Sequence, residues 1–75
     1  MSKTSPQTVI TGADILVARR RANVNQEDLA AEVGWYKQVL VAVESEKITL
    51  SQDDCRLLLS AIKHIEERRK KAATA

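Results

Sequence analysis

Three sites along the chain combine a helix-capping side chain with an aspartate three residues later. They are Thr11 with Asp14, Asn25 with Asp28, and Ser51 with Asp54. At this spacing the capping side chain accepts a hydrogen bond from a backbone N–H that a helix start leaves without a partner. Three helix starts within 75 residues, alongside only two glycines and one proline, leave little room for strands and tight turns. The sequence therefore predicts an all-α fold.

Apolar residues at helical spacing predict where the helices run. The first is expected over residues 12–22 and the second over 26–33, where Gly34 ends it as a left-handed cap. The valine-rich stretch that follows could be a buried strand, but it has no partner strand, so we assign a helix over 37–45. A last helix opens at Ser51 and keeps an apolar face to about residue 65. Together these segments predict a compact domain of four to five helices.

The limits of the domain follow from composition. Residues 1–10 lack helical spacing and predict a flexible N-terminal segment. Residues 11–66 form the expected domain, and residues 67–75 are predicted to be a charged, frayed tail. The chain is 44% hydrophobic but only 3% aromatic, so its core must be mainly aliphatic. Because so short a chain buries a limited core, we expect a partner subunit or a ligand to supply part of the stability.

Charge and single residues narrow the function further. The net charge of +2 permits an acidic partner such as nucleic acid but does not require one. The single cysteine, Cys55, indicates a reducing compartment, and no apolar run suits a membrane helix or a signal peptide. We expect a cytoplasmic protein with no membrane contact. His64 stands alone, and no nucleophile with a base is visible, so we expect no metal, no cofactor, no catalytic residues and no enzyme activity.

The most informative segment is residues 26–45, where two short helices flank Gly34. A mid-helix Ala30 leaves room for a second helix to cross, and Gly34 takes a positive φ easily. The apolar positions expected to face the core are Leu29, Val33, Trp35, Leu40 and Val43. This arrangement is typical of a helix-turn-helix unit.

The segment RRRANVNQEDLAAEVGWYKQVLVAVE (19–44) resembles the lambda-repressor-like helix-turn-helix family of the Cro, C-repressor and Xre type. The resemblance covers about residues 12–62 and implies a DNA-binding domain. It implies that Gln26 contacts a DNA phosphate and braces the recognition helix, and that Arg19 and Glu44 form a buried ion pair. Side chains expected to face the major groove or its phosphates are Tyr36, Lys37, Gln38, Val41 and Ser45. The chain departs from the family pattern at Tyr36, often a small residue, and at Glu46, often glycine.

General chemistry agrees with this interpretation. Lys37 can bind guanine O6 and N7, Gln38 can bind adenine N6 and N7, and Val41 can touch a thymine methyl group. Arg20 can reach a phosphate, although Arg20 could equally well be an exposed charge on a solvated helix surface. The sequence thus predicts a sequence-specific regulator of double-stranded DNA, a repressor of phage, plasmid or antitoxin type, acting as a homodimer.

An alternative remains open. The same fold could be a protein-interaction module, such as an antitoxin or adaptor. It would hold a toxin or the transcription machinery through the apolar face of the helix over 37–45, at Val39, Val41 and Ala42. Two further residues have structural interpretations: Trp35 as a buried core anchor, and Cys55 as a small semi-buried side chain, although a helix start could lower its pKa.

Overall fold

The computed structural model describes residues 9–74, and within them the chain forms four α-helices and no strand. The helices are α1 (Gly12–Arg21), α2 (Gln26–Val33), α3 (Lys37–Glu44) and α4 (Gln52–Thr74). The predicted all-α class is confirmed for these residues. The valine-rich segment is α3, which resolves the choice between helix and strand.

The capping side chains act as predicted. Thr11 Oγ1 accepts from the Asp14 N–H at 3.2 Å, and the Asp14 carboxylate accepts from the Thr11 N–H at 2.9 Å, which completes a capping box. The N–H groups of Asp28 and Asp54 donate to the side chains of Asn25 and Ser51 at 2.7 and 3.1 Å. At the other end of α2, Gly34 has the predicted left-handed conformation, with φ +74°. Local chemistry therefore defines three of the four helix starts and the C-terminal end of α2.

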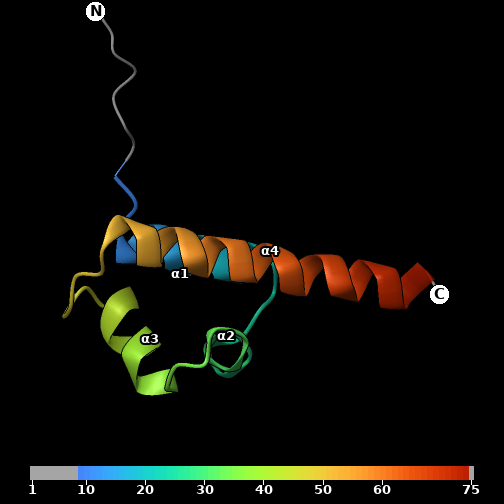
Figure 1. Cartoon of the computed structure of the whole chain (residues 1–75), viewed down its shortest axis with the longest axis horizontal. Coiled ribbons are helices and arrows are strands. Elements are labelled where there is room, and N and C mark those ends of the chain that lie inside the picture. The colour runs from blue at the N-terminus through green and yellow to red at the C-terminus, as the bar shows by residue number, and fades with distance from the viewer. Residues whose placement is uncertain (1–8, 75) are drawn as a thin grey trace, which may run out of the picture.

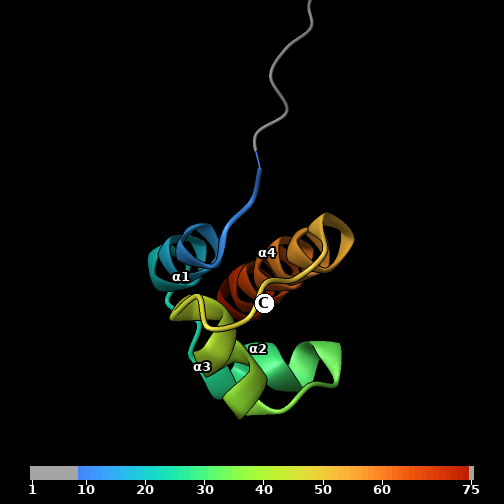
Figure 2. The same cartoon turned by 90° about the vertical axis from the view of Figure 1, so that its left-hand side faces the viewer.

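The helices form two layers. α1 lies behind α4 in Figure 1 and beside it in Figure 2, and both views place α2 and α3 beneath these two helices. α3 contacts both α1 and α2. None of the helices in residues 9–74 is long and apolar enough to cross a membrane.

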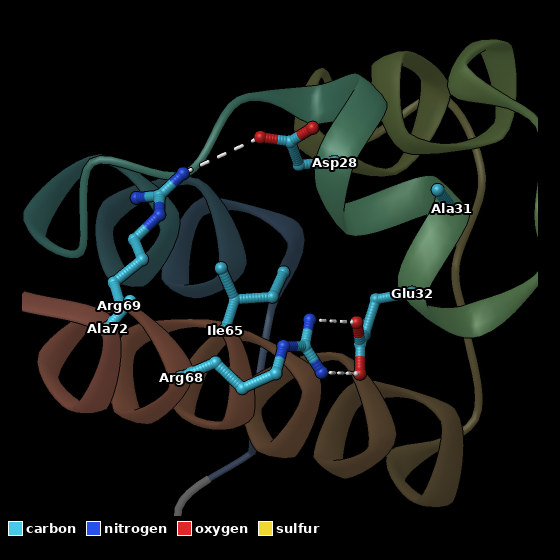
Figure 3. A pocket seen from close by; sticks show the side chains of 7 residues that line it. All are labelled: Asp28, Ala31, Glu32, Ile65, Arg68, Arg69 and Ala72. Atoms are coloured by element: carbon cyan, nitrogen blue, oxygen red, sulfur yellow. Dashed lines mark hydrogen bonds and ion pairs between the residues drawn. The ribbon is translucent and has the colours of Figure 1, made fainter. Parts of the chain in front are cut away.

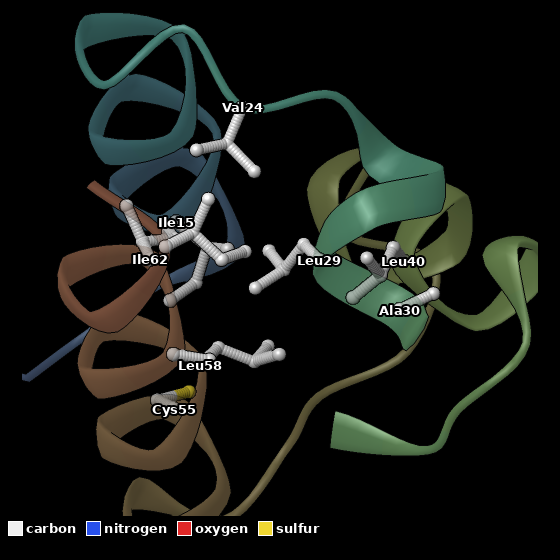
Figure 4. Close-up of a cluster of buried hydrophobic side chains, with 10 residues drawn as sticks. Ile15, Val24, Leu29, Ala30, Leu40, Cys55, Leu58 and Ile62 are labelled. Carbon is white, nitrogen blue, oxygen red and sulfur yellow. The ribbon is translucent and has the colours of Figure 1, made fainter. Parts of the chain in front are cut away.

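Each helix contributes a fully buried aliphatic side chain to one core: Ile15, Leu29, Leu40 and Leu58 (Figure 4). Leu29, Leu40 and Val43 are buried as predicted. Val33 and Trp35 also pack against the core, as expected, but both are only half-buried. They flank the Gly34 turn, where the chain leaves the core, so Trp35 is not a buried anchor.

The C-terminal helix is longer than the sequence indicated. α4 continues to Thr74, past residue 66, where we expected the domain to end and a frayed tail to begin. Arg68 and Arg69 form ion pairs with α2, which gives the charged turns a partner.

At the other end, residues 1–8 of the expected flexible segment lie outside the described residues. Ile10 is held, because its N–H and C=O bond to the Gln52 side chain at 2.8 and 3.0 Å.

Candidate nucleic-acid interface

The face of α3 that points away from the core carries a stripe of three predicted contact residues. Leu40 and Val43 are buried, whereas Lys37, Val41 and Ser45 are exposed. These three lie one helical turn apart, so they line up along α3. The stripe is the only part of the candidate site that sequence spacing alone could place on one face.

The structure brings residues from α1 and α2 beside this stripe. A shallow depression of about 480 Å³ runs between the start of α2, the end of α1 and α3. Five predicted DNA contacts line it together with the predicted ion pair: Arg20, Gln26, Lys37, Val41, Ser45, Arg19 and Glu44. Residues from three helices thus form one continuous surface, which we call the α3 face.

The ion pair beneath this face joins α1 to α3. Arg19 Nε donates to Glu44 Oε2 at 2.7 Å, and Nη2 donates to Oε1 at 2.9 Å. The two side chains are 12% and 5% exposed, so the predicted ion pair is present, and it is largely but not fully buried. The hydrogen bond to Glu44 raises the pKa of Arg19, and burial opposes it more weakly. A bidentate, charge-assisted pair of this kind fixes relative orientation as well as distance.

Gln26 adds α2 to the same cluster. Its side-chain N–H donates to Glu44 Oε1 at 3.0 Å, and Arg19 also donates to the Val24 C=O at 2.9 Å. Glu44 therefore accepts hydrogen bonds from both α1 and α2. This contact ties the start of α2 to the end of α3, while the phosphate contact that the resemblance implies for Gln26 stays a prediction.

Two predicted contact residues lie elsewhere. Tyr36 is 80% exposed and lines a separate depression, with Trp35, Val39 and Leu50. It precedes α3 and makes no capping hydrogen bond through its side chain. Gln38 is exposed but lines neither depression. Tyr36 and Gln38 therefore lie outside the depression that defines the α3 face.

The hydroxyl of Ser45 is directed to its own helix. Ser45 Oγ donates to the Val41 C=O at 2.7 Å, at the C-terminal end of α3. The hydroxyl proton of Ser45 is used in this hydrogen bond, so toward any other group the hydroxyl oxygen can only accept a hydrogen bond. A contact from Ser45 to DNA would be to a donor such as a base amino group.

The charges of the α3 face are mixed. Arg19 and Glu44 neutralise each other, which leaves Arg20 and Lys37 against Glu27. Neither Arg20 nor Lys37 forms a side-chain hydrogen bond or ion pair with another described residue. The N-terminus of α2 adds partial positive charge beside them. The face thus has a small positive excess that is available to an anion.

Three residues of this face were not predicted: Leu16, Asn25 and Glu27. Asn25 caps α2 immediately before Gln26, so its place beside Gln26 could have been inferred. Leu16 lies one turn before Arg19 and Arg20, which is a weaker signal. Glu27 is an acidic residue, and no sequence feature places it at a DNA contact.

Metal-ligating residue types are scattered in the described part of the chain. No group of three or more histidine, cysteine or acidic side chains gathers in residues 9–74 as a metal site would require. Cys55 is buried, and this burial raises the pKa of its thiol. The lowering that a helix start could cause is therefore outweighed.

Comparison of the chain with models of protein families, with curated proteins and with solved structures gave no match.

Proposed function

We propose that the protein binds double-stranded DNA with α3 in the major groove, as a lambda-repressor-like helix-turn-helix domain, and regulates transcription. The observation that carries the proposal is the α3 face. On it Lys37, Val41 and Ser45 lie beside Arg20 and Gln26, over a largely buried ion pair that fixes α3. DNA recognition needs this combination of phosphate contacts and base contacts on one rigid element.

The dimensions and chemistry of α3 support the proposal. An α-helix with its side chains is about 10–12 Å across, which fits a major groove about 12 Å wide. At the N-terminal end of α3, Lys37 can donate to the guanine acceptors O6 and N7, and Gln38 can pair with adenine N6 and N7. Val41, one turn later, can contact a thymine methyl group. Arg20 and Gln26, at the border, match the phosphate backbone.

A homodimer completes the proposed function. One α3 reads only a few base pairs, so specific binding calls for two copies on half-sites about 34 Å apart. We assign the contact between copies to α4, because α4 lies on the other layer from α3 (Figure 2).

Burial disfavours the alternative of a protein-interaction module acting through α3. Of the three residues that would form its apolar surface, Val39 and Ala42 are half-buried, and only Val41, 45% exposed, is open to solvent. A single exposed valine falls short of the contiguous apolar patch that marks a protein-binding surface.

The test is in vitro selection of bound duplexes from a random pool, followed by titration of the selected duplex. Lys37→Ala should weaken binding about 5- to 100-fold and relax the preference at one base pair, as expected for a lost base contact. Lys63→Ala, an exposed position on α4, removes the same charge and should change affinity much less, once sedimentation shows that this variant forms the same dimer as the wild type. Equal losses for the two variants, or equal binding to every duplex, would contradict the proposal.

A further inference from the structure

The charged end of α4 makes specific contacts with α2. Arg68 Nη1 donates to Glu32 Oε2 at 3.1 Å, and Nη2 donates to the other carboxylate oxygen at 2.5 Å (Figure 3). Arg69 Nη2 lies 3.5 Å from Asp28 Oδ2 (Figure 3). Asp28 and Glu32 are one helical turn apart, so the two arginines meet one side of α2 near both of its ends.

Arg69 also forms hydrogen bonds with the segment that connects α1 to α2. Its Nη1 donates to the Asn23 C=O at 2.7 Å and to the Ala22 C=O at 3.3 Å. Ala22 is the C-cap of α1, and Asn23 has a left-handed backbone with φ 61°. A single guanidinium thus contacts the end of α1, the turn and the first turn of α2.

Apolar packing between α2 and this part of α4 is incomplete. The two ion pairs border a depression of about 460 Å³, whose other lining residues are Ala31, Ile65 and Ala72 (Figure 3). The arginine side chains span this gap. An eight-residue helix has little stability of its own, so the orientation of α2 depends on such contacts.

We propose that Arg68 and Arg69 are positioning residues for DNA binding. They hold α2, and with it Asn25 and Gln26 on the α3 face, in the orientation that DNA requires, without touching DNA themselves. This inference rests on the proposed function. Arg68 and Arg69 then belong to the domain rather than to a frayed tail, which the sequence alone did not indicate.

A charge-removing substitution separates positioning from simple electrostatics. Glu32→Gln removes a negative charge, and electrostatics alone predicts tighter DNA binding. Positioning predicts the opposite sign, a loss of about two- to five-fold for the duplex that the wild type selects, the range expected from losing an exposed ion pair. The matched control is Glu67→Gln on the exposed surface of α4, which should bind as tightly as the wild type or more tightly. Tightening by Glu32→Gln equal to that of the control would overturn the proposal.

Exchanging the pair tests whether the contact, rather than the arginine, is required. Arg68→Glu should weaken binding, and the double variant Glu32→Arg/Arg68→Glu should recover most of the loss because it restores an ion pair at unchanged net charge. If Arg68 contacted phosphate directly, the double variant would stay as weak as Arg68→Glu.

Amide hydrogen exchange without DNA tests the positioning of α2 independently. Arg69→Gln should speed exchange in residues 24–33 about two- to five-fold, whereas Lys63→Gln should not. Unchanged exchange in Arg69→Gln would overturn the inference. If the wild type selects no duplex while exchange responds as expected, the proposed function fails and the holding of α2 by Arg69 stands.

Discussion

Glu44 is the residue on which contacts from two other helices converge. Its carboxylate is 5% exposed and accepts three hydrogen bonds, two from Arg19 and one from Gln26. A buried carboxylate is tolerated only when it is paired and hydrogen-bonded. Glu44 therefore ties the stability of the domain to the geometry of the α3 face.

Replacing Glu44 with glutamine should destabilise the domain strongly. The variant keeps the size of the side chain but removes the charge that Arg19 pairs with, and losing a hydrogen bond between charged groups typically costs about 1.5–3 kcal/mol. The free energy of unfolding in urea measures the loss. Glu67→Gln provides the control for removal of a surface charge. A loss no larger than that of the control would show that the pair contributes little.

Glu46 carries backbone strain that a substitution should relieve. Its φ is 61°, a left-handed conformation that costs a non-glycine residue about 1–2 kcal/mol. Glu46→Gly should therefore stabilise the domain by about 1 kcal/mol, measured by urea unfolding. Glycine at Glu67, inside α4, should instead destabilise by about 1 kcal/mol. Destabilisation by Glu46→Gly would mean that the Glu46 side chain contributes more than its backbone strain costs.

At the level of the helices, the two glycines limit the structure for different reasons. A Cβ on Gly12 would lie 1.8 Å from the Val43 C=O, so the start of α1 approaches the end of α3 too closely for any side chain. A Cβ on Gly34 would meet nothing within 4 Å, but the residue has φ +74°. The first position is restricted by packing between helices and the second by backbone conformation.

These two causes predict different responses to substitution. Gly12→Ala should lower the melting temperature more than Gly34→Ala. A Cβ 1.8 Å from the Val43 oxygen forces backbone to move, at the upper end of the about 1–3 kcal/mol or more that overpacking costs, against about 1–2 kcal/mol for positive φ. Asparagine tolerates the left-handed conformation, so Gly34→Asn should recover part of the loss at that position. No residue larger than glycine should be tolerated well at Gly12. Equal effects of the two alanines would contradict this distinction.

Sequence reasoning succeeded for the helices where the signal is local. The caps at Thr11, Asn25 and Ser51 act within three residues, and helical spacing identified Leu29 and Leu40 as core positions. It failed for the end of α4 because the partners of Arg68 and Arg69 lie 36 and 41 residues away. The residues next to a charged segment in the sequence do not indicate which distant carboxylates its side chains will pair with.

The same limit applies to the candidate site. Spacing along α3 placed Lys37, Val41 and Ser45 on one stripe, and the resemblance supplied Arg19, Glu44 and Gln26. Spacing did not show that Tyr36 lies on a separate surface, since a residue before the first turn of a helix is outside its periodicity. It also did not show that Glu27 would lie beside Lys37, because that depends on how α2 crosses α3.

In the whole molecule, the core is one cluster to which all four helices contribute, and Cys55 belongs to it. A small domain with a single core is expected to unfold as one unit. The thiol of Cys55 lies 3.7 Å from the Ile10 C=O and is 3% exposed. It should therefore react with a thiol reagent only when the domain opens.

The raised pKa of the Cys55 thiol, caused mainly by its burial, makes stability depend on alkaline pH. The unfolded thiol ionises near pH 8.5, while the folded thiol keeps its proton to higher pH. Its contribution to stability is therefore full below about pH 8.5 and is lost as the pH rises toward the folded pKa. Urea unfolding from pH 7 to 10 should show a steeper loss in the wild type than in Cys55→Ala, which cannot ionise. Parallel curves for the two proteins would contradict this prediction. They would show that the thiol ionises as easily in the folded protein as in the unfolded chain, although Cys55 is buried in the core when the protein is folded.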